Sequence, residues 1–463
     1  MQNLFDEVAS LDKRCYDEFG LSEDLLMEHA AEGMARYVRE HFEVNTKVLI
    51  ACGSGNNGAD GIACARLLHG DYNVFLLYVK EPRSIMAKLQ QKRAKAVGVK
   101  EIQEVLQCSV VIDAVVGTGF KGEFNDAISC VMQELNALEA FKIACDVPSG
   151  LKANGQCAKD TFCADISLTM GALKKSMFLD EAKEYVGSIE VMDLGVSRNI
   201  YERSSSWQLL DLDDLQLPYR EQKNSHKGVY GHLTIVSGSK VGASVISALS
   251  ALRFGAGLVS LVGYENEQVP YEIMYSHELP KTTSALAIGM GLGDEFSDTE
   301  MKNFLANDFP VVVDADMFHK PVILDLLKRK NVVLTPHAKE FVSLLKRTDL
   351  ADISVEELQK NRFLYVELFS KHFPDVVLLL KGANVIIAHK EKFYINPHGT
   401  SVLAKGGSGD VLSGLVGALL AQGYDAFQAA KNASLTHTLL AQNYKGTSFS
   451  LTPNDLINGI SEL

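Results

Sequence analysis

The sequence predicts an α/β protein with two domains, each built around a parallel sheet. Short apolar runs of strand-forming residues alternate with helical patterns along the whole chain, as they do where crossover helices join parallel strands. The 463 residues are too many for one ordinary domain. All eight cysteines lie between Cys15 and Cys163, which indicates separate histories for the two halves. We therefore expect one domain at 1–205, a linker at 206–222 and a second domain at 223–463.

The composition excludes several classes of protein. A net charge of −13 argues against a nucleic-acid-binding surface. No apolar run has the length that a membrane helix needs, and residues 1–7 have neither the basic region nor the apolar core of a signal peptide. The cysteines form no C-x-x-C pair, so we expect reduced and mostly buried thiols. These features predict a cytoplasmic protein that binds neither nucleic acid nor membrane.

The first domain opens with a helical segment and a strand–loop–helix unit. Residues 1 to about 42 are expected to be helical, because apolar side chains recur there at helical spacing. A strand-forming run at 47–52 leads into the Gly-rich loop 53–61, and a helical pattern follows at 62–68. Such a unit is typical of nucleotide-binding sheets, although these glycines do not form the GxGxxG pattern.

Polar loops follow three of the strands expected in this domain. The further strands are expected at 74–79, 110–116, 141–145, 164–170 and 189–193. The loops that carry glycine and polar residues are 53–61, 117–123 and 146–150. In a doubly wound sheet such loops meet at the carboxyl edge, where ligands bind.

These three loops resemble motifs of the NAD(P)HX epimerase family, whose domain is Rossmann-like and whose substrates are hydrated nicotinamide nucleotides. The resemblance covers most of residues 1 to about 200 and implies an oligomer interface in the first helical segment. It implies that Asp146 acts as acid or base at the nicotinamide. The implied substrate contacts are Asp146 and Asn56, Asn57, Gly58, Ala59, Asp60, Gly117, Thr118, Gly119, Phe120, Lys121, Gly122 and Glu123. Ala59 replaces the family's usual glycine, which matters if this residue needs a positive φ.

Three further residues of this domain match the family's potassium ligands. They are Asn57, Asp113 and Ser149, each at or after the end of an expected strand. Hard oxygen ligands suit a hard cation, and one negative charge is too little for tight binding of Mg²⁺ or Ca²⁺. The alternative is a buried, hydrogen-bonded group that supports the fold and holds no ion. The resemblance implies K⁺ in the epimerase domain.

The second domain shows the same alternation of strands and helices. A strand at 232–236 is followed by a helix through Leu252. Further strands are expected at 258–262, 285–288, 310–313, 332–334 and 376–380, and polar residues follow several of them. This pattern again predicts a parallel α/β sheet.

A Gly-rich stretch near the C-terminus, residues 405–414, is the most specific signal in the chain. Four glycines and a serine precede or flank Asp410, and an apolar helical pattern follows. Asp410 is therefore expected in the first turn of a helix whose free N–H groups suit a phosphate. A carboxylate there can accept the proton of an attacking hydroxyl. The alternative is an ordinary loop-to-helix turn with Asp410 as an N-terminal charge.

This stretch resembles the GGxGDxLxG motif of ribokinase-like kinases, and the domain is most similar to the NAD(P)HX dehydratase branch. The resemblance extends over about 235 residues and departs from the usual residue at Met290, Lys339 and Val385. It implies that Asp410 is catalytic and that Ala243, Gly291, His337 and Asp410 face the hydrated substrate. It implies nucleotide contacts from Lys381, Gly382, Ala383, Asn384, Val385 and Gly409.

Some residues of the second domain have more than one interpretation. His337 follows a proline at a strand end, where a histidine is often only a hydrogen-bonded loop residue. Glu340 and Asp316 could be helix-terminal charges or could help to order a metal. The loss of a threonine hydroxyl at Val385 puts one nucleotide contact in doubt.

We expect a bifunctional enzyme that repairs hydrated NADH and NADPH. One domain would interconvert the two epimers, and the other would dehydrate one of them with ADP or ATP and Mg²⁺. K⁺ is expected in the epimerase domain, and a homo-oligomer is expected. The alternative is a ribokinase-like small-molecule kinase fused to a noncatalytic Rossmann-like binding module, which would accumulate a phosphorylated product.

Overall fold

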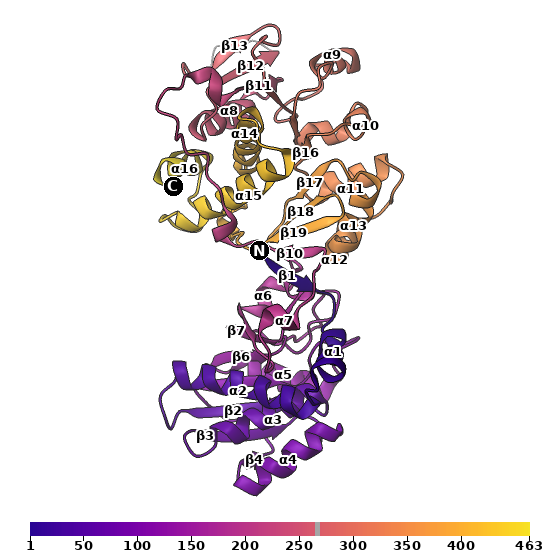
Figure 1. Cartoon of the computed structure of the whole chain (residues 1–463), viewed down its shortest axis with the longest axis vertical. Helices are drawn as coiled ribbons and strands as arrows, with labels where there is room; N and C mark the ends of the chain where they lie inside the picture. The colour runs from indigo at the N-terminus through magenta and orange to yellow at the C-terminus, as the bar shows by residue number, and fades with distance from the viewer. Residues whose placement is uncertain (264–268) are drawn as a thin grey trace. The chain divides into compact units, whose positions relative to one another are not determined.

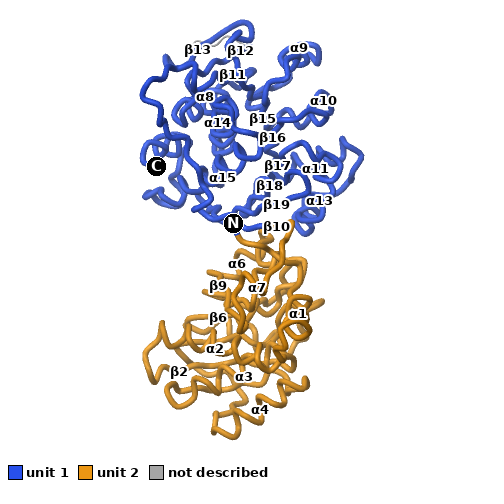
Figure 2. The backbone as a smooth tube through the Cα atoms, viewed as in Figure 1, with its two compact units in different colours: residues 1, 208–463 blue, residues 2–207 orange. Residues whose placement is uncertain are grey.

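The computed structural model describes residues 1–263 and 269–463. The chain divides into two compact units, one of residues 2–207 and one of residues 208–463 together with Met1 (Figure 2). We call them the N-terminal unit and the C-terminal unit. Their boundary lies inside the segment that we expected to be a linker.

Part of that expected linker is regular structure. Strand β10 spans Trp207–Leu209, and a 3-10 turn spans Leu212–Asp214. Within the C-terminal unit, the Lys431 ammonium donates to the Asp214 carbonyl at 2.8 Å, and the Gln216 N–H donates to the Asn432 side chain at 3.1 Å. These bonds attach the segment to helix α15 (Ala426–Asn443) of the same unit.

The N-terminal unit alternates strands with helices (Figure 1). Its strands are β1 (Gln2–Phe5), β2 (Lys47–Cys52), β3 (Asn73–Tyr78), β4 (Lys100–Ile102), β5 (Val110–Ala114), β6 (Phe141–Cys145), β7 (Ile166–Met170), β8 (Leu173–Lys174) and β9 (Ser188–Met192). Its helices are α1 (Ala9–Phe19), α2 (Glu23–His41), α3 (Asn56–Leu68), α4 (Ile85–Val97), α5 (Asp126–Ala137), α6 (Lys183–Val186) and α7 (Arg198–Tyr201).

Seven of these strands form one parallel sheet in the order β4-β3-β2-β5-β6-β7-β9. Its two faces bury alternate residues of each strand. Val48, Ile50 and Cys52 of β2 belong to the cluster that includes α2 and α3, whereas Leu49 and Ala51 belong to the cluster that includes α5. Both faces are therefore covered, which explains the continuous apolar runs in the sequence. The predicted doubly wound sheet is confirmed.

The expectation of a helix over the whole of residues 1–42 is wrong at its start. Gln2–Phe5 is strand β1, and Leu4 pairs in parallel with Leu173 of β8. Leu4 is only 1% exposed. Pairing with a segment about 170 residues away outweighs any local helical preference, which is weak in so short a segment.

The C-terminal unit has a second sheet. Its strands are β11 (His232–Ser237), β12 (Leu258–Gly263), β13 (Met274–Ser276), β14 (Ala285–Ile288), β15 (Val311–Val313), β16 (Val332–Leu334), β17 (Val377–Leu380), β18 (Val385–His389) and β19 (Lys392–Asn396). Its helices are α8 (Val241–Arg253), α9 (Asp298–Phe304), α10 (Ile323–Leu326), α11 (Ala338–Arg347), α12 (Val355–Lys360), α13 (Arg362–His372), α14 (Ser408–Ala421), α15 (Ala426–Asn443) and α16 (Pro453–Gly459).

Strands β13-β12-β11-β14-β15-β16-β17 are parallel, as expected, but β18 and β19 are not. They continue the predicted parallel sheet as two antiparallel strands, which the sequence did not indicate. Lys390 and Glu391, which connect them, have φ values of 51° and 55°. Two consecutive positive φ values are typical of the tight turn that closes a β-hairpin. Neither residue is of the kind that normally signals such a turn.

Helices α8 and α14 contact each other in this unit (Figure 1). Gly414 of α14 lies so close to α8 that a Cβ atom there would be 2.3 Å from the Ser247 carbonyl oxygen. The hydroxyls of Ser247 and Ser250 on α8 donate to the carbonyls of Asp410 and Val411 at 2.8 and 2.9 Å. Small residues therefore hold the first turn of α14 in place. Within the described residues, no helix combines the length and apolar character needed to cross a membrane.

Candidate active sites

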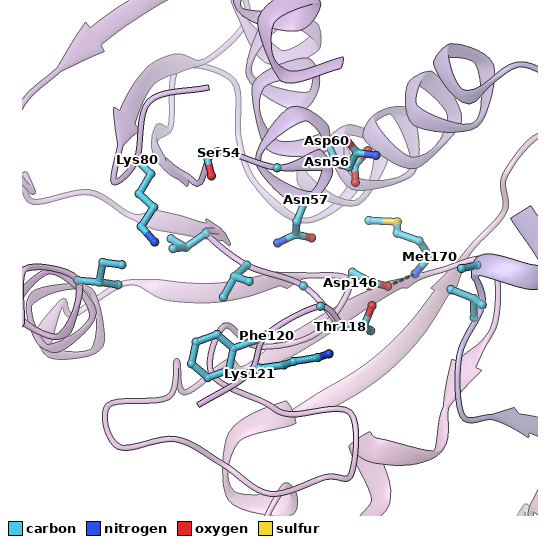
Figure 3. Close-up of a pocket in the computed structure, with 18 of the residues that line it drawn as sticks. Ser54, Asn56, Asn57, Asp60, Lys80, Thr118, Phe120, Lys121, Asp146 and Met170 are labelled. Atoms are coloured by element: carbon cyan, nitrogen blue, oxygen red, sulfur yellow. Dashed lines mark hydrogen bonds between the residues drawn. The ribbon is translucent and has the colours of Figure 1, made fainter. Parts of the chain in front are cut away.

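A cavity of about 790 Å³ lies in the N-terminal unit, where β2, β5 and β6 end. The chain runs outward from β2 to β4 and then returns to β5 on the other side of β2, so the cavity lies at the switch point of the sheet. Figure 3 shows side chains from three loops directed towards it, with Asp60 and Asn57 on one side and Phe120 and Lys121 on the other. The convergence expected from the three polar loops is present.

Most of the predicted epimerase residues line this cavity. Those that do are Asn56, Asn57, Asp60, Gly117, Thr118, Gly119, Phe120, Lys121, Glu123 and Asp146. Gly58 is buried in α3, where a Cβ atom would be 2.1 Å from the Gly53 carbonyl oxygen, so this glycine allows the loop and helix to pack. Ala59 is helical and fully buried, so the methyl group costs no backbone strain. Gly122 is in the loop with a φ of 79°.

Asp146 follows β6 directly and has an unusual backbone conformation with a φ of 70°. Its carboxylate forms an ion pair with the Lys174 ammonium and accepts the Met170 N–H at 3.0 Å (Figure 3). The Lys174 side chain is 1% exposed and also donates to the Thr169 hydroxyl and the Met170 carbonyl at 2.9 and 2.8 Å. A buried cation thus fixes the orientation of a carboxylate whose other side faces the cavity.

Two other aspartates line the same cavity. Burial raises the pKa of Asp60 well above its ordinary value, and the carboxylates of Asp146 and Asp12 add to this rise. Burial also raises the pKa of Asp12, on helix α1. The cavity therefore combines an ion-paired carboxylate with two carboxyl groups whose pKa values burial raises, which is an arrangement suited to proton transfer.

Asp113 and Ser149 form a buried pair beneath the cavity. The Ser149 hydroxyl lies 2.6 Å from Asp113 Oδ1, and the backbone N–H groups of Ser149 and Val115 donate to the same carboxylate at 2.7 and 3.1 Å. Burial raises the pKa of Asp113 to about 6, although these hydrogen bonds oppose the rise. Asn57 lies near Gly117, where a Cβ atom would be 3.2 Å from the Asn57 Oδ1 atom, and the N–H of the preceding Val116 donates to the Ser149 hydroxyl at 2.8 Å. Asn57 Nδ2 is buried without a hydrogen-bond partner.

In the C-terminal unit, Asp410 lies in the first turn of α14, as the Gly-rich stretch predicts. Gly407 precedes the helix with a φ of 89°, a conformation that favours glycine. Burial raises the pKa of Asp410 to about 7, the Asp314 carboxylate adds to this rise, and Lys381 opposes it. A carboxylate with such a pKa can serve as a general base near neutral pH.

Lys381 lies between carboxylates beside this turn. Its ammonium is 2.8 Å from Asp314 Oδ1 and 3.9 Å from Glu340 Oε2. Burial acts to lower the pKa of Lys381, but the two carboxylates outweigh it and raise the pKa. The Ser413 hydroxyl donates to Asp314 Oδ2 at 2.6 Å, which attaches the pair to α14. A Cβ atom on Gly409 would be 3.5 Å from the Lys381 ammonium, so the predicted nucleotide residues Lys381 and Gly409 are adjacent.

His337 is the N-terminal cap of α11. Its Nδ1 atom accepts the N–H groups of Lys339 and Glu340 at 3.1 and 3.2 Å, and the Glu340 carboxylate accepts the His337 N–H at 2.8 Å. His337 therefore has a structural role, and half of its side chain remains exposed. Glu340 is both a helix-terminal charge and a neighbour of Lys381. Asp316 accepts the Gly293 N–H at 2.9 Å and so orders the loop after β14.

The remaining predicted residues lie in segments around α14. Gly291 has a φ of 65°, and a Cβ atom there would be 2.2 Å from the Lys240 carbonyl oxygen. Ala243 begins α8, and its N–H donates to the same carbonyl at 3.2 Å. Gly382 and Ala383 are exposed after β17, whereas Asn384 is buried. The Val385 side chain is 8% exposed and belongs to the hydrophobic core, so its part in any nucleotide contact is limited to the backbone.

Several residues at these sites were not found from the sequence. Asp314 ends a buried strand as Asp113 does, so the same signal could have identified it. Lys174 could have been noticed as a lysine in an apolar run. Asp12 carries no such signal, because a single carboxylate within a helical pattern is ordinary.

Comparisons with known proteins assign both halves. Residues 233–462 match the family model described as NAD(P)H-hydrate dehydratase, and residues 23–176 match the model described as YjeF-related protein N-terminus. The chain is 43% identical over the full length of both proteins to a bifunctional NAD(P)H-hydrate repair enzyme of Helicobacter pylori. It is 32% identical to the enzyme of the same name from Dictyoglomus turgidum, over 98% of this chain and 96% of that protein.

A solved structure is similar to the C-terminal half. It is the ADP/ATP-dependent NAD(P)H-hydrate dehydratase from Bacillus subtilis, co-crystallised with ATP and Mg²⁺. Sequence identity is 30%, and the match covers 53% of this chain and 92% of that chain with a TM-score of 0.45.

Proposed function

This chain belongs to the family of bifunctional NAD(P)H-hydrate repair enzymes, and we propose how its two units divide the repair. The protein epimerises the R and S forms of hydrated NADH and NADPH and dehydrates the S form back to the reduced cofactor. The dehydration consumes ADP or ATP. We assign epimerisation to the N-terminal unit and dehydration to the C-terminal unit.

The observation that carries the dehydratase assignment is the environment of Asp410. Its carboxyl has a pKa of about 7 in the first turn of α14, beside the Lys381–Asp314 pair. The substrate hydroxyl attacks the terminal phosphorus of the nucleotide, and Asp410 takes the hydroxyl proton. The bond to the leaving AMP or ADP breaks at the same centre. N–H groups at the start of α14 and the Lys381 ammonium stabilise the developing phosphoryl charge.

The second step restores the double bond of the nicotinamide ring. The phosphate ester leaves as inorganic phosphate when its carbon–oxygen bond breaks, and the neighbouring ring carbon loses a proton as the double bond re-forms. Phosphate is a far better leaving group than hydroxide, which is the reason for consuming the nucleotide. Mg²⁺ would enter with the nucleotide and offset its negative charge. Lys381, Gly409 and the backbone of 382–385 are the residues that we assign to the nucleotide.

The epimerase assignment rests on Asp146 and its buried partner. The Lys174 ammonium holds the Asp146 carboxylate at the cavity wall, where the nicotinamide ring of the substrate would lie. The start of α3 at 56–60 and the polar loop 117–123 would hold the nucleotide. Epimerisation supplies the dehydratase with the form that it accepts.

One assay tests both assignments. Acid-hydrated NADH, which contains both epimers, is incubated with the enzyme and either ADP or ATP, and the recovery of reduced-nicotinamide absorbance is followed. We expect both epimers to be consumed. Consumption of one epimer alone would remove the epimerase assignment, and dependence on ADP or ATP identifies the phosphate donor.

We also propose that Asn57, Asp113 and Ser149 bind K⁺. The Ser149 hydroxyl has one proton, yet its oxygen lies 2.6 Å from Asp113 Oδ1 and 3.1 Å from the Val116 carbonyl oxygen. One of these oxygen pairs therefore lacks a proton between its members, and a cation would relieve the repulsion. Turning the amide of Asn57 by 180° would replace its unpartnered nitrogen with an oxygen ligand. The donor set is thus neutral oxygens with one carboxylate, which suits a monovalent ion.

A homo-oligomer in the cytoplasm completes the proposal. Tyr16, Phe19 and Leu25 on α1 and α2 are between 37% and 47% exposed, in the segment expected to form an oligomer interface. All eight cysteines are free thiols, which suits a reducing compartment. Light scattering of the purified protein tests the oligomeric state.

The alternative of a kinase fused to a noncatalytic module is not favoured. Full-length identity of 43% to a bifunctional repair enzyme covers both halves. A noncatalytic module would have no need for a buried Lys174 paired with a cavity carboxylate.

A further inference from the structure

A second carboxyl group, Asp12, enters the epimerase cavity from a different part of the chain. It lies on helix α1 and lines the cavity together with Asp146, which follows β6. The Tyr201 hydroxyl donates to Asp12 Oδ1 at 2.7 Å. This bond occupies one carboxyl oxygen and leaves the other available to a ligand. None of the loops that carry the cofactor-binding motifs contains Asp12.

The fold positions this carboxyl through Tyr201. The tyrosine is 1% exposed, and its ring lies against Gly171, where a Cβ atom would be 2.5 Å from the ring. Gly171 has a φ of 73°, so a side chain there would be both strained and obstructed. Arg14, two residues after Asp12, donates to the carbonyls of Ile200 and Tyr201. Helix α1 is therefore held against α7 at Asp12 and at Arg14.

The charged groups around Asp12 come from several elements. Burial raises its pKa, the Tyr201 hydrogen bond and the Lys174 ammonium oppose the rise, and the carboxylates of Asp146 and Glu7 add to it. Asp60, on α3, is also close enough for the Asp12 charge to raise its pKa. Asp12 thus favours its protonated form more than an exposed aspartate does, while Asp146 is ion-paired.

Inversion at the hydrated ring needs two proton transfers. Water that adds across an enamine double bond places the hydroxyl on the carbon next to nitrogen. Inversion can then proceed when a base removes the hydroxyl proton and the carbon–nitrogen bond breaks, with its electron pair going to nitrogen. An acid protonates that nitrogen, and an aldehyde forms. Rotation of the aldehyde and the reverse transfers close the ring as the other epimer, so no oxidant or reductant is needed. A base and an acid must act at two different atoms.

We propose that Asp12 is the second acid–base group of the epimerase, which protonates the ring nitrogen while Asp146 accepts the hydroxyl proton. Tyr201 is its positioning residue. The proposal rests on the epimerase function assigned above. It predicts that helix α1, outside the nucleotide-binding loops, is required for chemistry and not only for assembly.

The test is Asp12→Asn in the full chain, with Asp17→Asn as the matched control on the exposed side of the same helix. Chiral chromatography follows epimerisation, and recovery of the reduced cofactor from the purified S form follows dehydration. We expect Asp12→Asn to lose epimerisation by on the order of 100- to 10,000-fold, as removal of a general acid does. Dehydration should be unchanged in both variants, which shows that the C-terminal unit is intact, and circular dichroism of each variant checks the fold of the N-terminal unit.

Tyr201→Phe supplies a second measurement that leaves Asp12 in place. The wild-type rate should fall as pH rises through the pKa of the proton donor. Because the Tyr201 hydrogen bond lowers the pKa of Asp12, its loss should move this alkaline limb to higher pH. An unmoved limb, or Asp12→Asn with more than about half of the wild-type rate, overturns the proposal. The proposal is also overturned if Asp60→Asn abolishes the alkaline limb and Asp12→Asn does not. A wild-type enzyme that does not epimerise at all would instead overturn the assigned function.

Discussion

The Lys381 ammonium lies 2.8 Å from the Asp314 carboxylate, beside the first turn of α14 that contains Asp410. The two partners act on Asp410 in opposite directions, since Asp314 raises its pKa and Lys381 lowers it. Burial is the main cause of the raised pKa of Asp410, and the pair adjusts the pH at which the proposed base becomes active. It also places a positive charge next to Gly409, where a phosphoryl group would lie.

Asp314→Asn and Lys381→Met should therefore move the pH profile of dehydration in opposite directions. A base acts when deprotonated, so the wild-type kcat/KM should rise with pH through about 7 and then level off. Removal of Asp314 lowers the pKa of Asp410 and should move the rising limb to lower pH. Removal of Lys381 should move it to higher pH and weaken nucleotide binding. If both variants move the rising limb of the pH profile in the same direction, another group is the base.

Asp410→Asn should abolish dehydration while nucleotide binding remains. The amide keeps the shape of the side chain but cannot accept the hydroxyl proton, so we expect a loss on the order of 100- to 10,000-fold. Recovery of reduced-nicotinamide absorbance measures the rate, and calorimetry with ADP measures binding. Asp375→Asn, at an exposed position of the same unit, is the control. A variant with more than about half of the wild-type rate would remove Asp410 from the mechanism.

Asp146→Ala should abolish epimerisation and spare dehydration of the S form. Its carboxylate lines a cavity formed within the N-terminal unit, whereas Asp410 belongs to the C-terminal unit. The ratio of the two epimers over time, resolved by chiral chromatography, measures the effect. Asp165→Asn is not a suitable control because Asp165 accepts a backbone N–H, so we choose Asp17→Asn. An equal loss of both activities would contradict the division between the units.

K⁺ should raise the thermal stability of the protein relative to choline at equal ionic strength. Binding to the folded state alone stabilises it by about 1–3 kcal/mol at about 10 to 100 times the dissociation constant. Asn57→Ala should remove the difference. The Asp113 carboxyl has a pKa of about 6 without the ion, and the protonated form is a poor ligand. The K⁺ effect should therefore weaken as pH falls below about 6. Equal melting temperatures in the two salts at pH 8 would mean that Asp113 and Ser149 only support the fold.

Local sequence patterns were sufficient for features that depend on a few neighbouring residues. The stretch 405–414 lies at the start of a helix, as expected, whereas helix α3 begins at Asn56, inside the loop expected at 53–61. Asp410 lies in the first turn of α14 because the glycines before it interrupt regular structure. The apolar residues after it recur at helical spacing. The meeting of three loops at one cavity followed from strand alternation, because parallel strands place their carboxyl ends on the same edge.

Features that depend on distant pairs were not predictable in this way. Strand β1 exists because Leu4 pairs with Leu173, and the β18–β19 hairpin turns at two residues that do not normally signal a turn. His337 is expected to face the substrate, and the structure adds a role that the sequence did not indicate, because its Nδ1 atom caps the helix that follows. Each outcome depends on which hydrogen-bond acceptors are available to the backbone N–H groups once the chain has folded.

The sequence by itself determined the two α/β domains, the edge of each sheet that carries polar loops, and the two carboxylates proposed for catalysis. The domains, the polar edges and the position of Asp410 follow from periodicity and from residue types that lie next to one another in the chain, whereas the role of Asp146 is what the family resemblance implies. Only the tertiary structure decided the partners of those carboxylates. Lys174 contacts Asp146 across 28 residues and Lys381 contacts Asp314 across 67, and the cost of burying each charge is offset by the opposite charge and the hydrogen-bond partners that folding places beside it.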